Sequence, residues 1–152
     1  MYPTLLVLHS YGRWLVLIAL LVVLLRVYFC WKRGSLIGQM DAYVRVIALV
    51  VAGVQITTGL ALYFISPVVA YFYTRFPETI HLREVRFFGM EHSSMMLTGL
   101  LVFLWVLIRF YRPQTDNLRY KKATRWLTLA LFIILTSIPW SFWPLVSRPL
   151  FR

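Results

Sequence analysis

Acidic residues are scarce in this chain of 152 residues, which contains only five Asp and Glu and a single cysteine. One cysteine, Cys30, excludes an internal disulfide and offers no pair of thiols at metal-site spacing. The sequence also lacks a paired-carboxylate motif, a Gly-rich phosphate loop, a zinc-protease helix motif and a nucleophile elbow, so the common hydrolytic sites are excluded. Because carboxylates are so few, a proton-pumping relay is also poorly supplied.

Apolar residues dominate instead: 61% of the chain is hydrophobic, 17% is aromatic, and the mean hydropathy is +0.74. This composition is too apolar for a soluble domain and is typical of an integral membrane protein. Apolar runs are separated by short polar connections, and each run can cross the hydrocarbon layer at about 1.5 Å per residue. We therefore predict an all-α fold, with residues 1–152 as one domain. It is an up-down four-helix bundle with spans at about residues 5–31, 42–65, 84–108 and 126–142.

The 16 Lys and Arg residues give a net charge of +11, and most of them lie between the apolar runs. Such a distribution sets membrane topology, whereas nucleic-acid binding needs a basic face on a folded surface, so we expect no nucleic-acid partner. Connections rich in Lys and Arg stay in the cytoplasm, so we predict that both termini lie on the outer side. The residues behind this prediction are Lys32, Arg33, Arg45, Arg109, Arg112, Arg119, Lys121, Lys122 and Arg125.

Ionisable residues inside a span are rare, so each is a candidate for function. His9 lies roughly 7 Å and His92 roughly 12 Å from the outer end of its span, at the helical rise per residue. Spans one and three are diagonal in an up-down bundle, so both imidazoles can face the core in the same half. We predict that they ligate one haem iron from opposite sides. The alternatives are an interfacial anchor for His9 and a hydrogen-bonded neutral ring for His92.

Four further polar residues lie in the spans. Arg13 follows His9 by about one helical turn, where it can pair with a haem propionate or with Glu91. Gln55 is predicted to form an interhelical hydrogen bond, with a quinone contact as the alternative. Arg26 is expected to extend to the cytoplasmic lipid phosphates and has no catalytic role.

Other features near these residues allow further interpretations. Met95 and Met96 follow His92 at helical spacing and permit a soft-metal site such as copper, although methionine in a membrane core usually serves packing. His81 is expected to face solvent, with ligation in place of His9 as the alternative. The connection that contains it, residues 66–83, is rich in aromatic residues, so we expect it to lie along the outer interface as a lid.

Four segments carry a resemblance to a known family. They are LHSYGRWLVL at residues 8–17, GLALYFISP at 59–67, EHSSMMLTGLLVF at 91–103 and SIPWSF at 137–142. In content and order they are similar to the small four-span bacterial membrane proteins commonly labelled "cytochrome B". The resemblance implies a multi-pass protein of the bacterial cytoplasmic (inner) membrane, with its termini on the periplasmic side. It carries over His9 with Arg13 and Trp14, Glu91 with His92, and Pro139 with Trp140.

These patterns together predict an electron-transfer protein with one haem b, instead of a stand-alone enzyme. The expected iron ligands are His9 and His92, and two intramembrane histidines allow at most one bis-histidine haem. The expected partners are the lipid bilayer and a quinone pool. The alternative functions are a cofactor-free accessory subunit of a larger respiratory or transport complex and a copper- or haem-handling membrane protein. Further candidate partners are a larger respiratory complex and a second copy of the chain in a homo-oligomer. The other residues expected to contact the cofactor are Arg13, Gln55, Glu91 and Trp140.

Overall fold

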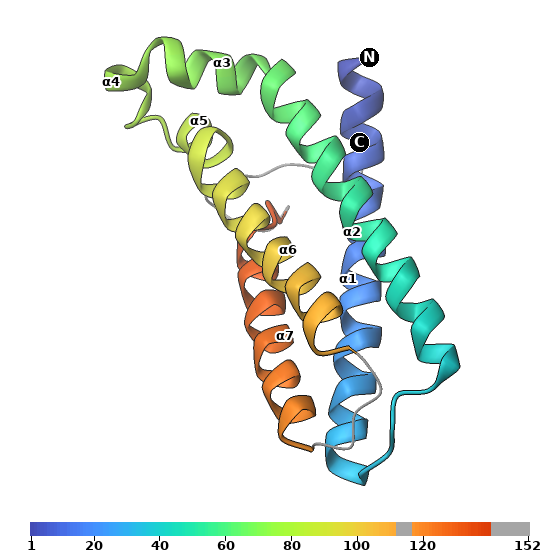
Figure 1. Ribbon diagram of the computed structural model, residues 1–152. Helices are drawn as coiled ribbons and strands as arrows, with labels where there is room; N and C mark the ends of the chain where they lie inside the picture. The colour runs from blue at the N-terminus through green and yellow to red at the C-terminus, as the bar shows by residue number, and fades with distance from the viewer. Residues whose placement is uncertain (112–116, 141–152) are drawn as a thin grey trace.

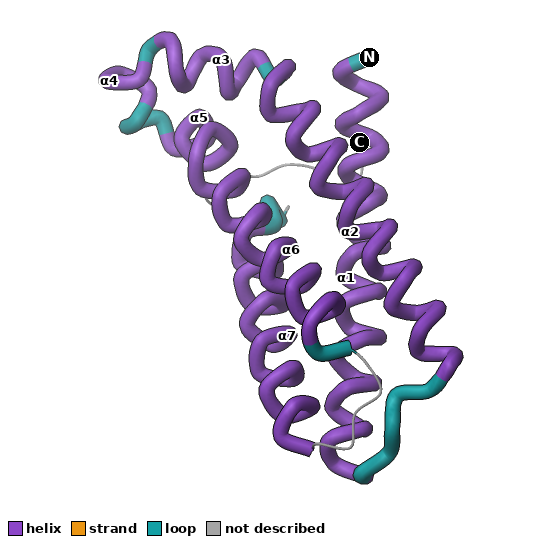
Figure 2. The backbone as a smooth tube through the Cα atoms, viewed as in Figure 1, coloured by secondary structure: helices purple, strands orange, loops and turns teal. Residues whose placement is uncertain are grey.

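The computed structural model describes residues 1–111 and 117–140, and this part of the chain is almost entirely helical, with no strand. Four long helices run alternately in opposite directions (Figure 1). A short loop joins the first two, and short helices and turns join the second to the third (Figure 2). The long helices are α1 (Tyr2–Arg33), α2 (Gln39–Ile65), α6 (His92–Arg109) and α7 (Asn117–Ser137). The prediction of an all-α fold is confirmed.

Within the described residues, three helical segments are long and apolar enough to cross a membrane: Tyr2–Arg33, Gln39–Ile65 and Arg83–Arg109. The third runs through α5 (Arg83–Arg86), the π-helical turn η1 (Phe87–Glu91) and α6. These segments expose large apolar side chains, and Ile18, Val50 and Leu101 are each more than half exposed. Such a surface is unfavourable in water and suits contact with lipid.

The fourth apolar run differs from its predicted form. α7 begins at Asn117, more than two turns before the predicted start at residue 126, and it includes the basic residues 119–125 in regular helix. Lys and Arg are good helix formers, so this basic cluster continues the helix instead of preceding it. The helix ends at Ser137, and residues 141–142 of the predicted span lie outside the described residues.

Local signals explain where the first connection begins and ends. Gly34 ends α1 with a φ of 66°, a left-handed conformation that glycine adopts without strain. The last turn of α1 carries Lys32 and Arg33, whose charges are favourable at a helix C-terminus. At the start of α2, the Asp41 carboxylate accepts a 2.8 Å hydrogen bond from the Gly38 backbone N–H. The loop between α1 and α2 is therefore short and fixed at both ends.

The long helices are packed in a cyclic order. α1 packs against α2 and α7, and α6 packs against α7 and α2, which leaves α1 and α6 at diagonal positions. The fully buried core lies toward the end where α1 finishes and α7 begins, around Leu20, Val27, Phe103 and Leu127. Within α1 no buried residue precedes Val16, so the other half of the helix arrangement is packed more loosely.

The connection between α2 and the third segment is helical. It contains α3 (Pro67–Thr74) and α4 (Phe76–Thr79), and α3 lies across the end of the long helices in Figure 1. Phe72 of α3 is buried, and its ring lies so close to Gly89 of η1 that a Cβ atom there would be 2.5 Å from it. Gly89 is therefore required for the contact between α3 and η1. His81, which follows α4, is exposed.

Candidate functional site

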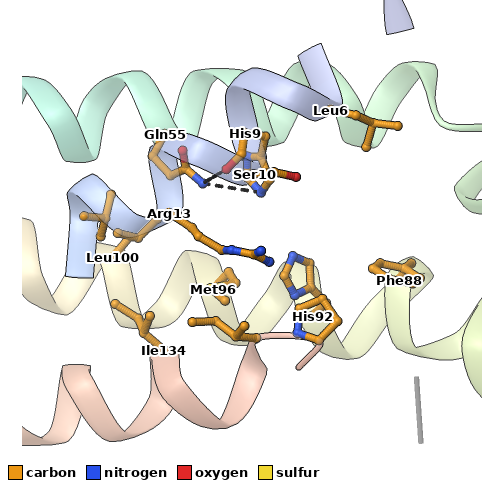
Figure 3. A pocket seen from close by; sticks show the side chains of 13 residues that line it. Leu6, His9, Ser10, Arg13, Gln55, Phe88, His92, Met96, Leu100 and Ile134 are labelled. Atoms are coloured by element: carbon orange, nitrogen blue, oxygen red, sulfur yellow. Dashed lines mark hydrogen bonds between the residues drawn. The ribbon is translucent and has the colours of Figure 1, made fainter. Parts of the chain in front are cut away.

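His9 and His92, each on a membrane-length segment, meet in the more loosely packed half. His9 comes from the first third of α1, and His92 is the first residue of α6, which is diagonally opposite. Their ring centroids are 6.5 Å apart, and the ring planes cross at 78° (Figure 3). The side chains face each other across the interior at one level, as the helical rise and the alternating helix directions predict.

His92 is held by elements on both sides. The π-helical turn before it adds a residue to one helical turn and so changes the direction of the side chains that follow. His92 Nδ1 lies 2.8 Å from the Ser137 carbonyl oxygen at the end of α7. A carbonyl oxygen only accepts, so Nδ1 carries the hydrogen and Nε2 of the neutral ring keeps its lone pair. That nitrogen is available to a ligand or a metal ion.

His9 is held by Gln55 of α2. The Gln55 amide nitrogen donates to the His9 carbonyl oxygen at 3.1 Å and lies 3.1 Å from His9 Nδ1 (Figure 3). The same amide nitrogen lies 3.4 Å from His9 Nε2. An amide nitrogen only donates, and Nδ1 is the nearer ring nitrogen, so we assign Nδ1 as the acceptor and place the ring hydrogen of neutral His9 on Nε2. A side chain at Gly12 would collide with the Gln55 amide oxygen, so glycine leaves the space that this amide occupies. Gln55 thus forms the interhelical hydrogen bond that the sequence predicts.

Two adjoining cavities share the histidine pair. The larger has a volume of about 450 Å³ and extends toward α2 and α3, and the smaller has about 110 Å³ and extends toward α7. His9, His92, Gln55 and Met96 line both cavities. The volume of the larger cavity is in the usual range for small-molecule and cofactor sites, about 300–1,000 Å³.

The larger cavity opens between α2 and the third segment. Leu60 of α2 and Met90 and Leu97 of the third segment line it and are also 44%, 45% and 38% exposed. Residues that both line a cavity and are exposed lie at its rim. These three rim residues are apolar and lie on membrane-length segments, so their side of the opening suits entrance from lipid. The rim also includes the exposed polar residues Tyr73 and Ser94.

Arg13 lines the smaller cavity together with Ser10, and its guanidinium extends toward His92 in Figure 3. Among the described residues that line either cavity, Arg13 is the only Arg or Lys. A guanidinium in an apolar cavity favours an anionic ligand group, because it forms charge-assisted hydrogen bonds with carboxylates.

A tyrosine pair at the far end of the larger cavity was not singled out in the sequence. Tyr63 of α2 donates a 3.0 Å hydrogen bond to the Gly89 carbonyl oxygen, and its hydroxyl lies 2.5 Å from that of Tyr73 in α3. Because Tyr63 donates to Gly89, Tyr73 is the donor to Tyr63. These two hydrogen bonds connect α3 to α2 and α2 to η1. Aromatic richness in residues 66–83 was visible in the sequence, but no local pattern marked Tyr63.

Two predicted cofactor contacts lie elsewhere. The Glu91 carboxylate pairs with Arg86 at 2.7 Å, so among the ion pairs of the described residues its partner is Arg86 and not Arg13. The Trp140 ring packs edge-on against Trp14 with centroids 6.1 Å apart, and its Nε1 donates to the Leu135 carbonyl oxygen at 2.9 Å. Neither Glu91 nor Trp140 is among the described residues that line the cavities.

Arg26 also differs from its expected role. Its guanidinium makes two hydrogen bonds to the Asp41 carboxylate, at 2.6 and 3.0 Å, instead of extending to lipid phosphates. Tyr111 lies 3.5 Å from the same carboxylate and acts as a neutral donor, because burial and the neighbouring Asp41 raise the pKa of its phenol. Asp41 is buried, and a buried carboxylate requires such partners. The sequence signal for this ion pair was the scarcity of acids, because Asp41 is one of only five.

The histidine pair has the spacing of two ligands on one metal. Among the described residues, no group of three or more His, Cys, Asp or Glu side chains is placed to hold a metal ion. Two imidazoles on opposite sides of one metal have centroids about 6 Å apart, from bonds of about 2 Å and about 1 Å between each nitrogen and its ring centre. The observed 6.5 Å is close to this value, so the spacing of the two rings is compatible with both imidazoles ligating one metal ion.

Comparisons with protein-family models, with curated proteins and with solved structures found no match to this chain. A functional proposal therefore depends on the histidine pair, the residues that hold it and the two cavities beside it.

Proposed function

We propose that this protein is a b-type cytochrome-like membrane protein that holds one haem between α1 and α6 and transfers electrons. The observation that carries the proposal is the approach of His9 and His92, from diagonal helices, to a centroid separation of 6.5 Å. Nε2 of His92 is available to iron because Nδ1 is bonded to the Ser137 carbonyl oxygen. The resemblance of residues 8–17 and 91–103, which contain both histidines, supports the same function.

The cavities support a planar cofactor at this pair. They adjoin at the two imidazoles, so there is space on the α2 side and on the α7 side of the ligand axis. His9 ligation through Nε2 requires the ring hydrogen to move to Nδ1 and the Gln55 amide to turn away from it. Arg13 is placed to bind the carboxylates of the cofactor.

A bound haem supplies one-electron chemistry at its iron. The chain itself would provide His9 and His92 as ligands to the iron, an apolar wall that excludes water, and the Arg13 cation. The apolar rim at Leu60, Met90 and Leu97 supports a lipid-soluble electron partner, for which a quinone is the proposed class.

The proposal includes a transmembrane four-helix bundle in the bacterial inner membrane, with both termini on the outer side. Phe132 of α7 is 65% exposed, like the apolar residues on the three membrane-length segments, which supports a fourth span. The basic residues gather where α1 finishes and α7 begins, which supports a cytoplasmic position for that end.

An absorption spectrum tests the proposal directly. The full chain, expressed with sufficient haem and purified in mild detergent, is expected to give the reduced-minus-oxidised difference spectrum of low-spin six-coordinate haem. His9→Ala and His92→Ala are each expected to lose this spectrum. His81→Ala is the matched control, because His81 is exposed and is not among the described residues that line either cavity, and it is expected to keep the spectrum.

Metal analysis of the same samples distinguishes the competing functions. Met96 lines both cavities beside the histidines, which favours copper as the second candidate metal. Copper at one equivalent, lost in Met96→Leu and in both histidine variants, would replace haem in the proposal. Protein that contains neither metal and tolerates His9→Ala and His92→Ala together would instead be a cofactor-free accessory subunit.

A further inference from the structure

Charge is distributed very unequally between the two ends of the molecule. Where α1 finishes and α7 begins, the described residues include nine Lys and Arg and one acid, Asp41, which is already paired with Arg26. Near α3 to η1, three arginines are matched by three glutamates. The nine cations are Arg26, Lys32, Arg33, Arg45, Arg109, Arg119, Lys121, Lys122 and Arg125.

Two of these cations converge on one aromatic ring. The Lys32 ammonium lies 4.7 Å from the Trp31 ring centroid, and the Lys121 ammonium, from α7, lies 5.9 Å from it. Lys32 also lies 6.0 Å from the ring of Tyr28, which packs edge-on against Trp31 at 5.9 Å. The ion pairs among residues 1–111 and 117–140 involve neither lysine. Both ammonium groups therefore lie close to one indole ring, and neither forms an ion pair with a carboxylate of the described residues.

The position of this cluster indicates which anion fits it. Trp31 is in the last turn of a membrane-length helix, and tryptophan at such an end lies at the level of the lipid headgroups. An ammonium group is a good partner for a phosphate, and basic pockets between helices on the cytoplasmic side bind anionic headgroups. Tyr28 and Phe29 are exposed beside it and provide apolar contact for the glycerol and upper acyl chain.

We propose that Trp31, Lys32 and Lys121 form a binding site for the phosphate headgroup of an anionic phospholipid. The lipid phosphate lies between the two ammonium groups, relieves their repulsion, and joins the end of α1 to the start of α7. The partner is a lipid and not a nucleic acid, because the indole places the site at the membrane surface, where anionic lipid is concentrated and would repel a polyanion. The site is independent of the histidine pair and of any haem.

Native mass spectrometry of the full chain tests this site. The protein is taken from vesicles that contain equal parts of phosphatidylglycerol and phosphatidylcholine, and the lipids that remain bound are counted. The wild-type protein is expected to retain phosphatidylglycerol in at least about fivefold excess, and Lys32→Gln with Lys121→Gln is expected to lose that excess. The control variant, Arg119→Gln with Lys122→Gln, removes the same amount of charge from exposed positions of α7 and is expected to keep the excess of phosphatidylglycerol.

Three outcomes would overturn the proposal. They are no preference in the wild-type protein, an equal loss in the two double variants, and displacement of the lipid by millimolar inorganic phosphate, which would make free phosphate the ligand. A second measurement applies even if the lysine variant fails to fold. Brominated phosphatidylglycerol is expected to quench wild-type fluorescence more than brominated phosphatidylcholine does, and Trp31→Phe is expected to remove the difference. A difference that persists in Trp31→Phe would contradict the site.

Discussion

At the scale of single residues, the rule that buried polar groups need partners explains most of the arrangement. The Gln55 amide is hydrogen-bonded to His9, and the His92 ring is hydrogen-bonded to the Ser137 carbonyl oxygen at the end of α7. Asp41 forms an ion pair with Arg26. Each bond joins two different helices, α1 with α2 or α6 with α7. The orientation of each histidine is thus set by a residue from another helix.

Replacement of Gln55 tests this dependence. Gln55→Leu keeps the volume but removes the hydrogen bonds to His9, so the free energy of unfolding is expected to fall by about 1 kcal/mol, a usual size for such bonds between membrane helices. Thr57→Ala is the control, because Thr57 is exposed and bonds only to Gly53 of its own helix. Denaturant titration in mixed micelles measures both. If the two variants had equal stability, the Gln55 bonds would not be contributing.

At the scale of elements, the π-helical turn η1 lies between the larger cavity, which it helps to line, and the helix α3. Gly89 of η1 packs against Phe72 of α3, and the Gly89 carbonyl oxygen accepts a hydrogen bond from Tyr63. The turn η1 ends directly before His92, the first residue of α6. A change in η1 is therefore expected to move α3 and the imidazole together. Turns of this kind occur frequently at functional sites.

A pair of glycine substitutions separates this contact from general helix effects. Gly89→Ala places a methyl group 2.5–2.8 Å from Phe72 and is expected to lower the free energy of unfolding by about 1–3 kcal/mol. A Cβ atom at Gly53 would have no neighbouring atom within 4 Å. Gly53→Ala is therefore expected to raise the free energy of unfolding by up to about 1 kcal/mol, because alanine is the better helix former. Thermal unfolding in detergent compares them. A stabilising Gly89→Ala would mean that α3 is not packed on η1.

At the scale of the whole molecule, the unequal charge at the two ends predicts the orientation in the membrane. One end has nine cations and one acid among the described residues, and the other is balanced, so the first is expected to remain in the cytoplasm. The same asymmetry provides the proposed lipid site. The histidine pair then lies in the outer half.

Cysteine labelling measures the orientation. In a Cys30→Ala background, which removes the single native thiol, His81→Cys is expected to react with a membrane-impermeant maleimide in intact cells. Leu36→Cys, in the loop between α1 and α2, is expected to react only after the membrane is opened. Both positions are exposed in the structure, so access to the reagent depends on the side of the membrane. The reverse pattern would place both termini in the cytoplasm.

The sequence by itself determined the helical class, the three membrane-length segments and the level of the two histidines. These properties follow from local composition and helical rise, because a continuous apolar run has to satisfy its backbone within one helix. The sequence was less accurate at α7, where the basic cluster is a connection by hydropathy but continues the helix by propensity.

Only the tertiary structure decided which polar groups meet. Gln55 with His9, Arg26 with Asp41 and Tyr63 with Tyr73 depend on the rotation of each helix about its axis and on contacts between distant segments. The rotation is set by packing of whole helix faces, and nothing in the local sequence of one helix reports the face that its neighbour presents. For the same reason the position of Glu91 beside Arg86, and not beside Arg13, could not be obtained from spacing alone.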